Sequence, residues 1–226
     1  MNWNVRKTLL LLFLLASFAN GVRAQPLSAT DVKTLLERIR EKRAAAPSMQ
    51  ADFQEQRKIH LLDEPINSSG KIWFQAPNKF RVERKGNAPS ITVSDGQQLW
   101  IYYPNFKSAE RYSLAKRSPL DAAISAITTA LNLENVEHTF HITGEKSEKG
   151  YDLELTPRNP SMKRIFQKLL LHLSNDLFAE RTDMLQANGD RTVTTYENTG
   201  HAAISAGQFE FTPPPGTEVS TPLGKQ

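Results

Sequence analysis

Apolar side chains follow two different periods along the chain. Between Ser28 and about Arg43 they recur at helical spacing. From Met49 the period becomes two, so that Met49, Ala51 and Phe53 point to one face and polar residues point to the other. The first spacing is typical of an amphipathic helix, and the second of a half-buried strand. The sequence therefore predicts an N-terminal helix followed by strands.

Turn-forming residues divide the rest of the chain into short segments. Clusters of Pro, Gly, Asn and Asp interrupt the alternation at 63–65, 76–78, 85–87, 94–96 and 103–105. A helical pattern returns between Pro119 and Leu131, and strands are predicted afterwards at 138–143, 151–156, 163–174, 177–186 and 192–196. This order predicts a mainly β (α+β) fold, in which a single strongly curved antiparallel sheet forms an incomplete β-barrel. The N-terminal helix and a central helical lid would cover the sheet.

The first 24 residues have the features of a secretory signal peptide. A short basic region containing Arg6 and Lys7 precedes an apolar run over residues 8–18, and Val22 and Ala24 place small side chains before a cleavage site. The apolar run is about half of the roughly 20 residues that a membrane span needs. We therefore expect residues 1–24 to be removed near Ala24, and residues 25–226 to form one domain in the periplasm.

Charge and cysteine content exclude several classes of protein. Three positive charges of the formal net charge of +4 lie in the expected signal peptide, so residues 25–226 carry +1 and show no basic stripe for nucleic acid. The chain has no cysteine. Disulfide scaffolds, thiolate metal sites, cysteine nucleophiles and lipid attachment through cysteine are therefore excluded.

The sequence contains no recognisable catalytic motif. It lacks a Gly-x-Ser-x-Gly turn, a glycine-rich phosphate loop and a His-Glu-x-x-His helix. His138 and His141, the closest histidine pair, would point to opposite faces of a strand, and Asp152 and Glu154 alternate with apolar residues as on a solvated strand face. We expect no metal, no cofactor and no enzymatic activity.

The predicted strands carry more large apolar side chains than the predicted helices can cover. We expect these side chains to line the concave side of the sheet as a lipid-binding face. They are Phe53, Ile72, Phe74, Phe80, Val82, Ile91, Val93, Leu99 and Ile101.

Two interpretations of this apolar surface are open. In the first, the two helices simply fill the concave side. In the second, the central helix is a lid over a ligand cavity, because its inward side chains are biased towards small ones and would leave room. These lid residues are Ala123, Ile124, Ile127 and Leu131.

Four segments resemble the LolA-like family of periplasmic outer-membrane lipoprotein carriers. Residues 70–80 read GKIWFQAPNKF and residues 93–104 read VSDGQQLWIYYP, in the order and spacing of two signature strands of that family. Residues 153–157 read LELTP and residues 209–216 read FEFTPPPG, which resemble its middle strand and C-terminal segment. The resemblance thus covers nearly all of the chain after the expected signal peptide.

The resemblance implies a monomer that holds the acyl chains of a lipoprotein or lipid between sheet and helices. It also implies an inner-membrane complex that releases the cargo to the carrier and an outer-membrane receptor that accepts it. By resemblance, Phe80 belongs to the binding face and Ile72 and Leu99 are its neighbours. Trp73 and Trp100 alternate with the apolar set, so for them a lipid-binding role and a structural role both stay open.

One position departs from the family pattern and leaves other functions open. The family commonly has Arg before the Pro-Asn of its signature strand, where this chain has Ala76; Gln75 could partly replace its hydrogen bonds. The alternatives are a carrier of a free lipid, glycolipid or other acylated product, and a lipoprotein-sensing domain that binds a protein through its open sheet edge.

Overall fold

The computed structural model of the protein describes residues 24–114, 133, 136–164 and 166–222. The expected central helix, with the lid residues Ala123, Ile124, Ile127 and Leu131, lies outside them, as do residues 1–23 of the expected signal peptide. The lid therefore stays a prediction from the sequence.

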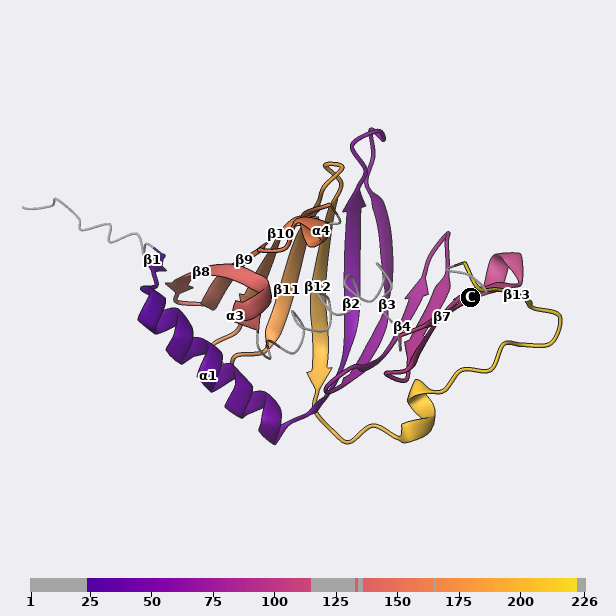
Figure 1. Ribbon diagram of the computed structural model, residues 1–226, viewed down its shortest axis with the longest axis horizontal. Coiled ribbons are helices and arrows are strands. Elements are labelled where there is room, and N and C mark those ends of the chain that lie inside the picture. The colour runs from indigo at the N-terminus through magenta and orange to yellow at the C-terminus, as the bar shows by residue number, and fades with distance from the viewer. Residues whose placement is uncertain (1–23, 115–132, 134–135, 165, 223–226) are drawn as a thin grey trace, which may run out of the picture.

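Strands dominate the described residues (Figure 1). The strands are β1 (Gln25–Pro26), β2 (Ser48–Lys58), β3 (Ile66–Gln75), β4 (Lys79–Lys85), β5 (Ser90–Ser94), β6 (Gln98–Tyr103), β7 (Ser108–Ser113), β8 (Phe140–Ser147), β9 (Gly150–Pro157), β10 (Phe166–Leu173), β11 (Ala179–Gln186), β12 (Arg191–Gly200) and β13 (Glu218–Ser220). The helices are α1 (Ala29–Ala45), α3 (Val136–Thr139) and α4 (Pro160–Lys163), with 3-10 turns η1 (Pro104–Phe106) and η2 (Ala206–Phe209). None of these helices is long and apolar enough to cross a membrane.

The described strands form one 13-stranded sheet in the order β1-β8-β9-β10-β11-β12-β2-β3-β4-β5-β6-β7-β13. Figure 1 shows that the sheet is strongly curved, and β1 and β13 are its two free edges, so it does not close. The predicted curved, incomplete barrel is confirmed. The pairing is antiparallel throughout except for β13, which runs parallel to β7 because a long C-terminal segment brings it back to that edge.

Helix α1 begins where the sequence predicts. Ser28 accepts a hydrogen bond at Oγ from the backbone N–H of Asp31 (3.2 Å) and donates its own backbone N–H to Asp31 Oδ2 (3.1 Å), which forms a capping box. The side-chain and backbone hydrogen bonds from Ser28 lower the pKa of Asp31. The buried positions Val32, Leu36 and Ile39 lie on one face of the helix, as their spacing requires.

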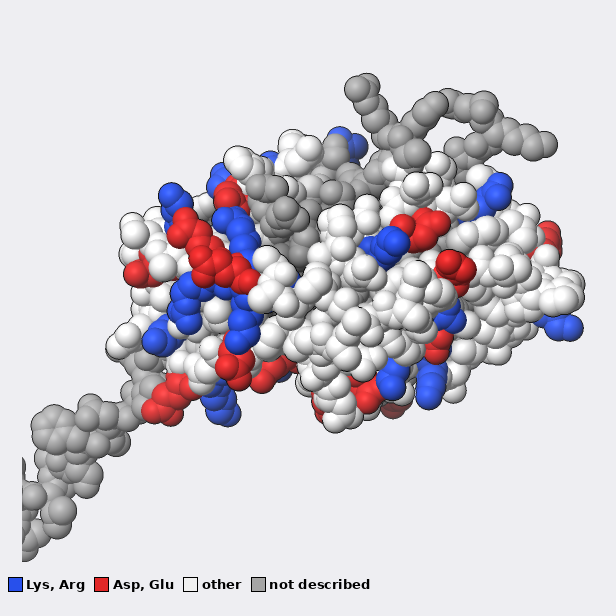
Figure 2. Space-filling model, turned by 90° about the horizontal axis from the view of Figure 1, so that it is seen from below, with Lys and Arg blue, Asp and Glu red and all other residues white. Residues whose placement is uncertain are grey.

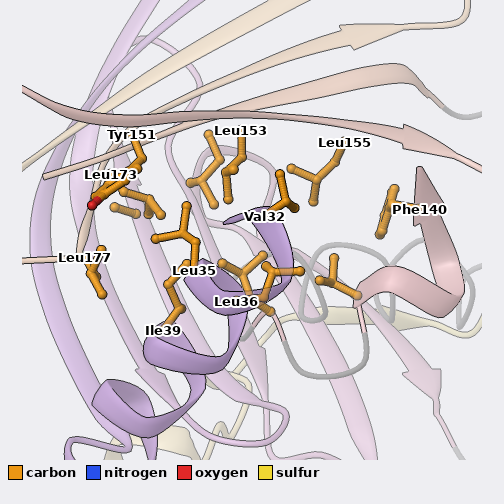
Figure 3. Close-up of a cluster of buried hydrophobic side chains, with 14 of the residues drawn as sticks. Val32, Leu35, Leu36, Ile39, Phe140, Tyr151, Leu153, Leu155, Leu173 and Leu177 are labelled. Carbon is orange, nitrogen blue, oxygen red and sulfur yellow. The ribbon is translucent and has the colours of Figure 1, made fainter. Parts of the chain in front are cut away.

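The larger hydrophobic core lies between α1 and strands β8 to β11 (Figure 3). Ile39 and Leu35 of the helix point towards Tyr151 and Leu173 of the sheet, and both Ile39 and Leu173 are fully buried. We call the side of the sheet on which α1 packs the inner face and the opposite side the outer face. The inner face continues past this core onto β12 and β2. There Tyr196 packs against this core and also against a second cluster of buried apolar residues on β2 and β3.

Several strand boundaries differ from the prediction by a few residues. The strand predicted from Leu177 begins at Ala179, because Leu177 has a positive φ of 67° and closes a turn by donating its backbone N–H to Ser174 O. His138 lies in α3 rather than in a strand.

Candidate functional site

An apolar floor covers the inner face of β2, β3 and β4. It is formed by a buried hydrophobic cluster and the partly buried side chains packed against it. We define the floor as Met49, Ala51, Phe53, Ile72, Phe74, Phe80 and Val82.

The strand register places these side chains next to one another. Ile72 lies opposite Ala51 on one side and opposite Val82 on the other. Phe74 lies in the same way between Met49 and Phe80. Directly opposed residues of antiparallel strands share a face, so the side chains form a continuous surface across three strands. The sequence prediction that Phe53, Ile72, Phe74, Phe80 and Val82 share one face is confirmed by this register.

A glycine and an ion pair border one end of the floor. Phe53 lies opposite Gly70, and the absence of a side chain there leaves room for its ring. Beyond them, Arg84 donates to Glu55 through Nε (3.2 Å) and Nη2 (3.0 Å), and its guanidinium carbon lies 5.8 Å from the centre of the Phe53 ring. Most of the Glu55 side chain is buried. The apolar surface therefore ends at this ion pair, whose two charges balance.

Two of the predicted lining residues do not belong to the inner face. Val93 lies opposite Arg81 and Trp100, and Ile91 lies opposite Glu83 and Tyr102. These partners alternate with the floor residues, so the prediction that Ile91 and Val93 line the same face is wrong. The inner face of β5 instead carries hydroxyl groups, from Ser90, Thr92 and Ser94. Ser94 is fully buried and donates to Asn78 O (3.2 Å).

The outer face of the same strands has an apolar cover of its own. The ring centre of Phe211 lies 5.7 Å from that of Trp100 and 5.6 Å from that of Tyr102. Trp73 also lies on this face, where the Lys71 ammonium is 5.9 Å from its ring centre. These positions favour the structural role for both tryptophans. They also explain why Val93 is buried although it faces away from the floor.

The C-terminal segment that provides this cover is nearly uncharged. Residues 201–217 contain one charged residue, Glu210. Figure 2 shows charges of both signs gathered where α1 lies and a mostly uncharged middle, along the course of the C-terminal segment. Within this segment, Phe211 packs on the outer face of β6.

The inner face becomes apolar again at β6 and then polar at β7. Leu99 lies opposite Ser94 and Ile101 lies opposite Thr92, so both predicted residues are on the inner face, separated from the floor by the hydroxyl groups of β5. On β7, Tyr112 donates to Glu110 Oε2 (2.6 Å). Burial, together with this carboxylate, raises the pKa of Tyr112 to about 12, so the hydroxyl stays protonated as a donor.

A pocket lies at the other end of the floor, where α1 passes into β2. It is lined by floor residues, by the end of the helix and by an aromatic pair. The lining residues are Arg43, Ala46, Pro47, Met49, Phe74, Ala76, Phe178 and His201. Phe178 and His201 are stacked with ring centres 3.9 Å apart, and the Lys42 ammonium is 5.5 Å from the centre of the Phe178 ring.

Arg43 brings a buried positive charge to this pocket. Its Nε atom is out of contact with solvent, and burial lowers the pKa of Arg43 to about 10, so the group remains charged at neutral pH. Sequence reasoning missed Arg43. The signal was present, because Arg43 follows Val32, Leu36 and Ile39 at helical spacing and thus belongs to the buried face of α1.

Arg43 lies beside the position where the family pattern has arginine. Ala76 and Arg43 line the same pocket, so a guanidinium is present there although residue 76 has none. Gln75 cannot replace it on the inner face. It lies opposite Ser48 and Lys79, in the register of Trp73, and so points to the outer face.

We expect Ala76→Arg to destabilise the protein by roughly 1–3 kcal/mol, because it brings a second cation into a pocket that already holds a buried one. Urea denaturation measures the effect, and Ala76→Arg in an Arg43→Met background is the control. There the cost should fall by at least about 0.5 kcal/mol. An equal cost in both backgrounds would show that the two positions do not interact.

Among the described residues, no three His, Asp or Glu side chains gather in a way that would hold a metal ion. The arrangement on the inner face is an apolar surface across three strands, with an ion pair at one end and a cationic pocket at the other. Apolar side chains of this kind pack against alkyl groups.

Comparison with known proteins gives one consistent family. The family described as outer membrane lipoprotein carrier protein LolA matches residues 44–212. The outer-membrane lipoprotein carrier protein of Serratia proteamaculans is 27% identical over 150 residues, which cover 66% of this chain and 70% of that protein. The protein of the same description from Chromohalobacter salexigens is 27% identical over 204 residues, which cover 87% of this chain and 91% of the relative.

Solved structures that are similar to this chain are more distant in sequence. The crystal structure of an uncharacterized conserved protein from Thermus thermophilus has a TM-score of 0.53 at 14% identity, covering 84% of this chain and 98% of that chain. A LolA superfamily protein from Nitrosomonas europaea has a TM-score of 0.46 at 16% identity, covering 79% of this chain and 97% of that chain. At 14% identity, the Thermus likeness shows the fold alone.

Proposed function

The chain belongs to the LolA family of outer-membrane lipoprotein carrier proteins, and we propose that it shelters the acyl chains of lipoproteins on its inner face while carrying them from the inner to the outer membrane. In this proposal the protein binds and releases cargo without chemical change.

The observation that carries the proposal is the continuity of the apolar floor. Seven apolar side chains from three neighbouring strands lie on one face. Polar groups stand at the ends of this surface, where Arg84 pairs with Glu55 and where Arg43 lines the pocket. An amphiphile with long alkyl chains matches an apolar strip that ends in polar groups.

The energy of acyl exposure makes such shelter necessary. Each methylene group in water costs about 0.8 kcal/mol, so a chain of about sixteen methylenes costs on the order of 13 kcal/mol. A carrier must also release its cargo. Net binding therefore has to be much weaker than this gross figure, with the difference lost to ordering of the carrier and incomplete burial of the chains.

The proposal also includes export of the protein and two membrane partners. We assign residues 1–24 to a signal peptide that is removed near Ala24, which leaves residues 25–226 as one monomeric carrier domain in the periplasm. The cargo would be received from an inner-membrane release complex and passed to an outer-membrane receptor.

Phe80→Glu tests the binding face. The carboxylate would lie in the floor beside Phe74 and Val82, so binding of a fluorescent acyl-chain probe should weaken by roughly tenfold or more. Ile91→Glu is the matched control, because Ile91 is also half-buried and lies on the adjacent strand but on the outer face. Circular dichroism should show that both variants keep the sheet. Equal losses of probe binding in the two variants, or no loss with Phe80→Glu, would contradict the assignment.

The identity of the cargo is tested separately by mass spectrometry of the protein purified from periplasm. A triacylated peptide bound to the wild type but not to Phe80→Glu is the expected result. A free lipid instead would assign the protein to export of a different acylated product, and the absence of any lipid would favour a protein-binding role.

A further inference from the structure

The tip of the β2–β3 hairpin exposes large aliphatic side chains. Leu61 is 80% exposed, Leu62 is 47% exposed and Ile66 is 44% exposed. In the described part of the chain, only Phe106 and Val219 are other large apolar residues with comparable exposure. The hairpin projects beyond its neighbours at the top of Figure 1. The tip is thus a convex apolar feature, whereas most large apolar side chains of the described residues are at least partly buried.

Hydrogen bonds hold this loop in place. Leu62 donates its backbone N–H to Ile59 O (2.9 Å), which forms a turn. His60 donates its backbone N–H to Asp190 Oδ1 (3.1 Å), and its ring Nδ1 lies 3.1 Å from the same oxygen. Asp190 belongs to the turn between β11 and β12, so the loop is fastened to the adjacent hairpin. The leucines are therefore presented without a large further loss of conformational entropy on binding.

The tip lies beyond the polar end of the proposed binding face. Ile66 lies opposite Arg57, and this pair points to the same face as the pair of Phe53 and Gly70, which lies four residues away along each strand. Strands β2 and β3 thus lead from the floor, past the Glu55–Arg84 ion pair, to the exposed aliphatic side chains. A membrane bound at the tip would therefore lie next to this end of the inner face.

We propose that this tip inserts into the interfacial layer of a lipid bilayer and so places the end of the inner face at the membrane that donates or receives the cargo. The inference rests on the proposed carrier function. A convex tip with a few aliphatic side chains suits insertion between lipid headgroups, whereas a stable protein interface requires about 800 Å² per partner.

The charges near the tip indicate that burial of apolar side chains, and not attraction between charges, drives the proposed membrane binding. Arg57 and Lys58 at the end of β2 are balanced by Asp63 and Glu64 in the loop. With no net charge, the tip needs no anionic lipid, and its binding to a zwitterionic bilayer depends little on salt.

Flotation of the mature wild-type protein with phosphatidylcholine vesicles tests the proposal. Wild type should float with the vesicles in low and in high salt. Leu61→Glu combined with Leu62→Glu should weaken vesicle binding at least tenfold, equivalent to about 1.4 kcal/mol. Val219→Glu is the control, because Val219 is 46% exposed on the terminal strand β13, and it should bind vesicles like the wild type.

The outcomes separate this inference from the proposed function. Both tip substitutions should leave binding of a soluble acyl-chain probe unchanged in the absence of vesicles, because neither residue belongs to the floor. Wild type that binds the probe but does not float would overturn the membrane inference alone, and the tip would then be assigned to a protein partner. Equal vesicle binding by the tip variant and the wild type would also overturn it. Failure of the wild type to bind the probe would refute the carrier function instead.

Discussion

Gly70→Ala is expected to destabilise the protein by roughly 3 kcal/mol or more, because a methyl group at this position has no space on the inner face. An added Cβ would lie 2.0 Å from Glu83 O and 2.6 Å from the ring of Phe53. To relieve this steric clash, either β4, which carries that carbonyl, must shift, or the Phe53 ring must move out of the floor. Urea denaturation should show the loss of stability, and any folded fraction should bind the acyl-chain probe more weakly.

Gly207→Ala is the matched control for this substitution. An added Cβ at Gly207, in η2, meets nothing within 4 Å, and the change should alter stability by less than about 0.5 kcal/mol. If Gly70→Ala were as mild, the close packing of Phe53 on the glycine would not be a feature of the native protein.

Ile39→Ala should cost about 3 kcal/mol, through lost burial and the cavity that remains. Ile39 is fully buried where α1 packs on the sheet, near Leu35 in Figure 3. The loss should be visible as a lower midpoint of urea denaturation with an unchanged slope. Because Arg43 lies one turn further along α1, loosening of the helix should also disturb the pocket at the end of the floor.

Glu37→Ala provides the comparison on the same helix. Glu37 is exposed, so its replacement should change stability by no more than about 0.5 kcal/mol. A similar effect of the two substitutions would mean that the buried face of α1 contributes little to the fold.

The helix and the first strands were predictable because their signals are local. Ser28 and Asp31 cap α1 through bonds between residues three apart, and the apolar spacing of the helix is a property of a single element. The alternation of Met49, Ala51 and Phe53 likewise describes one strand, whichever strands lie beside it. Such patterns predict the structure correctly because they do not depend on which distant residues pack nearby.

The face to which β5 directs its apolar residues was not predictable in this way. Alternation shows that Ile91 and Val93 share a face, but it does not show which face. The outer face is apolar here, because the ring of Phe211, more than a hundred residues further along the chain, packs on Trp100 and Tyr102, whereas the inner face of β5 carries hydroxyl groups. Only the register with Arg81 and Trp100 decides the assignment.

The sequence by itself thus determined the class of fold, the family, the N-terminal helix and which residues of each strand point to the same face, since these depend on residue types and short spacings. The tertiary structure decided which face each strand presents, that Arg43 lies beside Ala76, and that the apolar hairpin tip lies beyond the Glu55–Arg84 end of the floor. Those facts depend on strand register and on packing between segments far apart in the chain, and neither can be read from a local pattern.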